Sequence, residues 1–256
     1  MKSLLAFIKK EFLGQLREGK LFILTALFLL FGVMNPLVAK LTPWLLEIMA
    51  DSLAESGMQV TNVTVTAMDS WVQFFKNIPI ALIAFTLIEG SIFTKEYSSG
   101  TLILALTKGF NRFKVVLSKI ITLITVWSVG YFVCFLVTYG YNAYFWDNQV
   151  ANNLIFSVLS WWMFGIFVVS LITIFSTIFT SNSGVLLSTG GVVFASYLLG
   201  VIPKINKFLP TFLTDGNSLI YGVLGASKYV IALIITIVLT LICFISSVII
   251  FNKKQL

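Results

Sequence analysis

Histidine is absent from this sequence of 256 residues, and charged residues make up only 11% of it. A soluble globular domain is about 25% charged, so the composition excludes a soluble enzyme, a disordered chain and a nucleic-acid-binding domain. The absence of histidine also excludes imidazole metal sites, haem ligation and histidine-dependent proton relays. The two cysteines, Cys134 and Cys243, each lie deep in an apolar run, which favours packing roles over a disulfide or a metal site.

Apolar residues dominate the chain, at 58% of the sequence with a mean hydropathy of +0.99. A helix needs about 20 apolar residues to cross a bilayer, and six runs approach or exceed that length. The sequence therefore predicts an all-α integral membrane protein with a transmembrane domain over residues 21–251 and a short tail over 252–256. The expected spans are 21–38, 77–94, 120–139, 154–179, 185–202 and 229–251.

Residues 1–20 form a separate unit before the first span. Apolar residues recur there at helical spacing, whereas the basic residues lie largely on other sides of the helix. This pattern predicts an amphipathic helix that lies in the headgroup layer. The alternative is a plain basic tail. The apolar positions are Met1, Leu5, Ile8, Phe12 and Leu16.

The distribution of Lys and Arg predicts the orientation. With the N-terminus inside, twelve of these residues fall on the cytoplasmic side and only five on the outer side. Cytoplasmic loops carry the excess of positive charge in membrane proteins, so both termini are expected in the cytoplasm. On the outer side, residues 203–227 contain Pro203, Pro210 and Gly216 among apolar residues, which predicts short helices dipping into the outer leaflet.

Within the expected spans one ionisable residue stands out, Glu89 near the inner end of the second span. It is either an inner gate or buried pair, or a solvated acid at the interface. The spans carry no charge near the bilayer midplane, which argues against an ion-driven transporter. The sequence also lacks the GxxxxGK[ST] phosphate loop, so any energy for transport must come from another polypeptide.

The segment between the second and third spans, residues 94–119, is too apolar for a solvated loop. Ser99 or Thr101 is a candidate N-cap for a short apolar helix over 102–107. Such a helix docks into the groove of a soluble partner or lies on its own membrane surface.

This segment resembles the permease subunits of type-two ABC exporters. In that family an acidic residue, Gly-Thr-Leu, an apolar residue, an Arg and a Lys follow the second span. The sequence departs from the pattern at residues 108–111, where the family often has a Pro and a Ser. The matching residues are Glu96, Gly100, Thr101, Leu102, Leu106, Arg112 and Lys119.

The resemblance implies a half-transporter that pairs with a second permease subunit, as a homo- or heterodimer within membrane lipid. Separate ABC ATPase subunits would bind ATP and Mg²⁺, so this chain is expected to hold no cofactor, no metal and no catalytic residue. A cytoplasmic coupling helix near Glu96–Thr107 would dock into the ATPase. The residues implied in ATPase coupling are Glu96, Gly100, Thr101, Leu102, Leu106 and Arg112.

Glu96 is also expected to contact a basic group, either on the ATPase or on the N-terminal helix, where Arg17 and Lys20 are candidates. The alternative is a simple favourable interaction with a helix dipole. The resemblance further implies that the second and fifth spans line the translocation path. Ordinary helix packing is the alternative for each of those residues, which are Leu82, Phe85, Thr86, Ser188, Val192 and Phe194.

The expected cargo is an amphipathic peptide, an antimicrobial or a lipid-like compound, because an apolar path does not compensate the desolvation of a strongly ionic cargo. The compact chain is similar to Gram-positive permeases that export amphipathic toxin peptides, such as phenol-soluble modulins, which implies a bacterial cell membrane. The alternative function is a non-transporting membrane sensor or immunity protein of the same fold.

Overall fold

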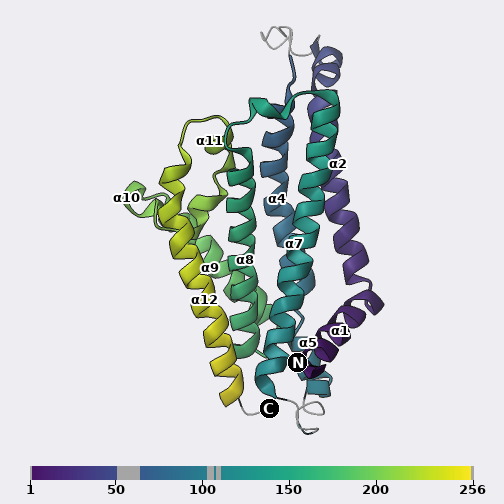
Figure 1. Ribbon diagram of the computed structural model, residues 1–256, viewed down its shortest axis with the longest axis vertical. Coiled ribbons are helices and arrows are strands. Elements are labelled where there is room, and N and C mark those ends of the chain that lie inside the picture. The colour runs from purple at the N-terminus through teal and green to yellow at the C-terminus, as the bar shows by residue number, and fades with distance from the viewer. Residues whose placement is uncertain (1, 51–63, 103–106, 108–110, 255–256) are drawn as a thin grey trace.

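The computed structural model describes residues 2–50, 64–102, 107 and 111–254. Every regular element in these residues is a helix (Figure 1). Six of them are long and apolar enough to cross a membrane, which confirms the predicted all-α integral membrane fold. The six long helices are α2 (Lys20–Ile48), α4 (Ala67–Glu89), α7 (Arg112–Phe145), α8 (Leu154–Ile178), α9 (Asn182–Gly200) and α12 (Val230–Lys253).

Two shorter helices lie at the end of the bundle that carries both termini (Figure 1). The first, α1 (Lys2–Arg17), turns sharply into α2 at Gly19, whose φ of 73° is one that glycine adopts at no steric cost. The second, α5 (Thr94–Ser98), follows α4 after a few residues. Finding the N- and C-terminal helices at one end agrees with an even number of crossings.

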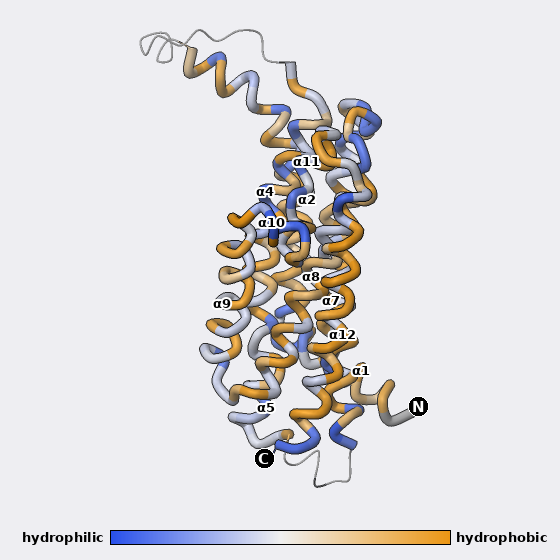
Figure 2. The backbone as a smooth tube through the Cα atoms, turned by 90° about the vertical axis from the view of Figure 1, so that its left-hand side faces the viewer, coloured by the Kyte–Doolittle hydropathy of each residue, from blue (hydrophilic) through white to orange (hydrophobic). Residues whose placement is uncertain are grey.

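The long helices bury a core of aromatic rings in which Trp127 of α7 is central. Its indole lies 5.9 Å from the ring of Phe28 on α2 and 5.5 Å from that of Phe85 on α4, and all three side chains are fully buried. Gly165 of α8 leaves room for the same indole, since a Cβ there would come within 2.1 Å of it. Figure 2 shows hydrophobic residues along the lengths of α7, α8 and α12.

A polar network inside the apolar bundle joins α2, α4 and α7. The Asn77 amide donates to Asn35 Oδ1 at 2.7 Å, and Asn35 donates to the Thr138 hydroxyl at 3.0 Å. Thr138 in turn donates to the carbonyl of Gly32 at 3.0 Å. Pro36 deprives that carbonyl of its helical partner, so Thr138 satisfies it and the helix continues.

The helix ends differ from the expected spans. The sequence predicted that the first span ends near Val38, but α2 continues through Pro43 to Ile48. The second helix begins at Ala67, well before residue 77, because Thr66 and Asp69 form a capping box at its start.

Short helices connect α9 to α12, as the Pro and Gly residues predicted. Ser157 of α8 donates to the carbonyl of Gly216 at 3.2 Å, which joins them to a long helix. Within the connection, the Tyr229 hydroxyl donates to the carbonyl of Asp215 at 2.9 Å. Their depth in a membrane stays a prediction. The elements are α10 (Pro203–Asn206), η2 (Pro210–Thr214), α11 (Gly216–Ile220) and η3 (Ala226–Tyr229); η1 (Asn148–Val150) joins α7 to α8.

Candidate functional site

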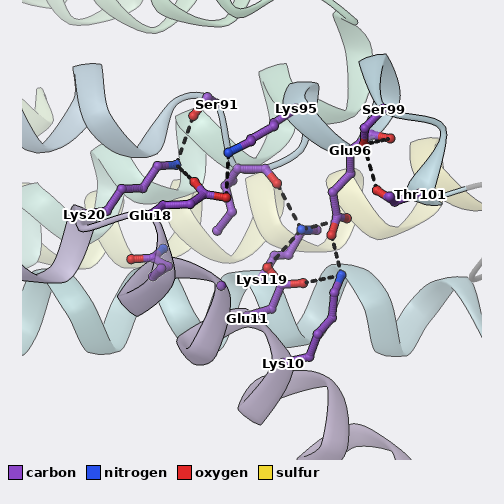
Figure 3. Close-up of a pocket in the computed structure, with 13 residues that line it drawn as sticks. Lys10, Glu11, Glu18, Lys20, Ser91, Lys95, Glu96, Ser99, Thr101 and Lys119 are labelled. Atoms are coloured by element: carbon purple, nitrogen blue, oxygen red, sulfur yellow. Dashed lines mark hydrogen bonds and ion pairs between the residues drawn. The ribbon is translucent and has the colours of Figure 1, made fainter.

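A buried lysine joins three helices at the end of the bundle that carries the termini (Figure 3). Lys119 lies in the second turn of α7 and its side chain is only 1% exposed. Its ammonium group donates to Glu11 of α1 at 3.0 Å, and it contacts Glu96 of α5 at 2.9 Å and the carbonyl of Ile92 at 2.9 Å. Each of the three N–H donors of a lysine therefore has an acceptor.

A second lysine completes what we call the Lys119 cluster, which consists of Lys10, Glu11, Glu96 and Lys119. Lys10 of α1 is half-exposed and forms an ion pair with Glu96, and it lies 3.4 Å from Glu11. Partial burial works against the charge of Lys10, but the hydrogen bond and attraction from Glu96 raise its pKa above the ordinary value. The two cations and two carboxylates alternate, so the cluster compensates its own charge.

A second group of charges lies beside this cluster, at the turn between α1 and α2. Glu18 pairs with Lys95 at 2.7 Å and with Lys20 at 3.6 Å, and Lys20 donates to the Ser91 hydroxyl at 3.0 Å. Slight burial opposes ionisation of Glu18, but the Lys95 hydrogen bond and the nearby Lys20 charge lower its pKa. The turn is therefore tied to α5 through Lys95 and to the residues before α5 through Ser91.

Glu89 lies deeper, at the C-terminal end of α4, and its side chain is fully buried. It is therefore not a solvated acid, which was one of the two expected readings. Gln15 of α1 donates to one carboxylate oxygen at 2.6 Å. The other oxygen has no hydrogen-bond partner among the described residues, and neither does Gln15 Oε1. A gating role for Glu89 stays a prediction.

The two charge groups and Gln15 surround a cavity of about 270 Å³. Figure 3 shows Lys10, Glu11, Glu96 and Lys119 pointing toward one another from α1, α5 and α7. Because these charges are engaged in ion pairs, the arrangement suits a mechanical connection between helices better than binding of a charged ligand. Among the described residues, no group of three His, Cys, Asp or Glu side chains has the arrangement of metal ligands.

The sequence predicted that Glu96 contacts a basic group on the ATPase or on the N-terminal helix. The structure shows a contact with the N-terminal helix, but with a different residue from the two candidates. Lys10 and Lys119 contact Glu96, not Arg17 or Lys20. Glu11 was missed altogether. A signal for it existed, because Phe7, Glu11 and Gln15 recur at intervals of four residues and form the buried side of α1.

The other residues implied in ATPase coupling lie in varied surroundings. Gly100 has a φ of +67° after α5, Thr101 is exposed with its hydroxyl 2.9 Å from that of Ser99, and Leu102 is buried. Leu106 and most of the predicted helix over 102–107 lie outside the described residues. Arg112 donates to the carbonyl of Phe251 at 3.1 Å, so within this chain it binds the C-terminal end of α12.

The residues implied in the translocation path divide into two groups. Leu82 and Phe85 are buried between helices, and Thr86 bonds the carbonyl of Leu82 at 2.8 Å. On α9, Ser188 is half-buried, whereas Val192 and Phe194 are exposed, Phe194 at 65%. The surroundings of the residues on α4 are therefore those of ordinary helix packing within one chain. The exposed residues on α9 can contact lipid or another protein chain.

Comparison with known proteins identifies one family. The model of the family described as "ABC-2 family transporter protein" matches residues 5–256. The match covers all six long helices and most of α1. A search of curated proteins gives no significant match.

We expect the replacement Lys119→Met to destabilise the fold by about 3–5 kcal/mol, since it leaves two carboxylates without their buried partner. Lys95→Met is the matched control. That side chain is 57% exposed and pairs with a partly exposed Glu18, so its loss should cost at most about 1 kcal/mol. Denaturant unfolding in detergent micelles measures both. Adding Glu11→Gln to Lys119→Met should recover part of the loss; equal stability of the two single variants would refute the buried pairing.

Proposed function

This chain belongs to the ABC-2 family of transporter proteins, and we propose that its Lys119 cluster is where a separate ATPase acts on the membrane domain. As a member of that family it is a transmembrane permease of an ABC exporter. It is the membrane component of transport and not itself the catalyst, and the family implies partnership with ABC ATPase subunits. Those subunits would bind ATP and Mg²⁺.

The connection of α5 to α1 and α7 is the observation that carries this proposal. Glu96 is only 16% exposed, and two lysines on two different helices hold its carboxylate. A displacement of α5 therefore pulls on α1 through Lys10 and on α7 through Lys119. Ion pairs with charge-assisted hydrogen bonds are well suited to this because they resist separation more strongly than neutral contacts do.

The exposed side of the 94–119 segment is the proposed docking surface for the ATPase. Thr101 is exposed and follows Gly100, whose positive φ turns the chain after α5. Thr101 carries this proposal, because Leu102 is buried within the chain and residues 103–106 lie outside the described residues. Closure of the ATPase pair on ATP would then move α5.

A second permease subunit is proposed to pack against the exposed side of α9. This helix packs on α8 and on the short helix η2, and its remaining surface carries large exposed apolar side chains, among them Leu187, Val192 and Phe194. Leu82, Phe85 and Thr86 on α4 would border a path only when α4 separates from its neighbours. Lipid contact is the alternative for the surface of α9.

The proposed cargo is an amphipathic peptide, an antimicrobial or a lipid-like compound. Glu89 is buried and accepts a hydrogen bond from Gln15, so it is not exposed to a cargo. The long helices carry few other charges that could replace the hydration of an ionic cargo. The resemblance to Gram-positive exporters of amphipathic toxin peptides, such as phenol-soluble modulins, supports this class. No observation on the described residues favours the alternative function, a non-transporting membrane sensor or immunity protein.

Docking of the ATPase is tested with a bulky charge at the proposed surface. Thr101→Arg should weaken co-purification of the partner ABC ATPase by more than about tenfold, because an unpaired charge becomes buried on docking. The matched control is Gln149→Arg in η1, which is exposed at the opposite end of the bundle. Both variants should reach the membrane at the same abundance. Wild-type co-purification and ATP hydrolysis by Thr101→Arg would contradict the proposed docking surface.

The orientation proposal is that the end bearing α1, α5 and the C-terminal end of α12 faces the cytoplasm, since that end carries most of the Lys and Arg residues. With Cys134 and Cys243 replaced, a cysteine introduced at exposed Gln149 should react with a membrane-impermeant thiol reagent on intact cells. One introduced at exposed Ser98 should react only after lysis. Labelling of position 98 on intact cells would reverse the orientation.

A further inference from the structure

The C-terminal end of α12 lies against the beginning and the end of the chain segment that contains α5. Arg112, the first residue of α7, donates from Nη1 to the carbonyls of Phe251 at 3.1 Å and Asn252 at 3.5 Å, and also to that of Lys254. The last carbonyls of a helix lack intrahelical partners and carry partial negative charge. The guanidinium of Arg112 therefore caps α12 and attaches the start of α7 to it.

Lys254 likewise caps the C-terminal end of a helix, in this case α8. Its ammonium group donates to the carbonyls of Thr177 at 2.9 Å and Ile178 at 3.3 Å, which end α8. It also lies 4.4 Å from the centre of the Tyr97 ring in α5, within the range of a cation–π interaction. One side chain thus contacts α5 and α8 and is itself attached to the end of α12.

Buried aromatic contacts connect this region with the Lys119 cluster. Phe93 precedes α5, is fully buried, and lies 6.0 Å from the ring of Phe251. Lys119 lies 5.2 Å from the centre of the same Phe93 ring. Phe93 and Tyr97 are four residues apart and share one side of the turn, while Glu96 reaches the lysines. The residues of α5 are therefore held by α1 and α7 through one set of contacts and by α12 through another.

We infer that Lys254 is a positioning residue that ties α5 to the C-terminal ends of α8 and α12. The functional part of this inference rests on the proposed function: displacement of α5 by an ATPase would move α8 and α12 as well as α1 and α7. The two halves of the bundle would then respond together. Arg112, implied by resemblance in ATPase coupling, contributes to this connection from within the chain.

Hydrogen–deuterium exchange on the purified chain tests the positioning directly. In Lys254→Met, the amides of residues 94–98 should exchange about tenfold faster or more, because charge-assisted hydrogen bonds and the contact with Tyr97 are lost. Lys253→Met is the matched control: the neighbouring side chain is exposed, and its loss should leave that exchange unchanged. Lys254→Arg should restore most of the protection. Equal exchange in Lys254→Met and Lys253→Met would overturn the inference.

A second measurement adds the ATPase and separates this inference from the proposed function. In the complex, Lys254→Met should bind the ATPase as wild type does but hydrolyse ATP severalfold more slowly, with recovery in Lys254→Arg. Wild-type hydrolysis by Lys254→Met would contradict transmission through α12. If the wild-type chain fails to bind the ATPase, the proposed function fails, and the exchange measurement still decides whether Lys254 positions α5.

Discussion

The ammonium group of Lys119 sets the strongest constraint on this structure. Removing an ammonium ion from water costs several kcal/mol unless acceptors replace its hydration, and the apolar bundle provides few. Glu11 must therefore come from α1 and Glu96 from α5, together with a carbonyl between α4 and α5. The position of α1 across the end of the bundle and the position of α5 beneath α4 both follow from this requirement. Three segments far apart in sequence are joined by one side chain.

The same constraint explains why α5 is suited to receive motion. Its carboxylate is bound from two helices by Lys10 and Lys119, and its aromatic side, Phe93 and Tyr97, is bound by the end of α12. A short helix with exposed residues next to such contacts has little freedom to move alone. Under the proposed function, this rigidity would let work done by a soluble ATPase reach helices that cross the membrane.

The sequence predicted the six long helices because each requires a run of apolar residues that no soluble fold would tolerate. It misplaced two helix ends that lie beyond the apolar runs: α2 continues through Pro43 to Ile48, and α4 begins at the capping box of Thr66 and Asp69. The family resemblance pointed to Glu96 as a residue of interest. The partners of Glu96 depend on how α1 packs against the bundle, and residue spacing alone does not specify that packing. Arg112 was likewise implied in coupling without any indication that it binds the C-terminal end of α12.

The distance between α1 and α5 during the ATPase cycle tests the central claim most directly. With the native cysteines replaced, spin labels at the exposed positions Lys9 and Ser98 report this distance by pulsed electron paramagnetic resonance in the reconstituted complex. The Lys119 cluster predicts the same distance without nucleotide and in the vanadate-trapped state, because α1 and α5 move as one unit. A distance that changes on trapping while the cluster is intact would show that α5 moves independently of α1 and would contradict the account.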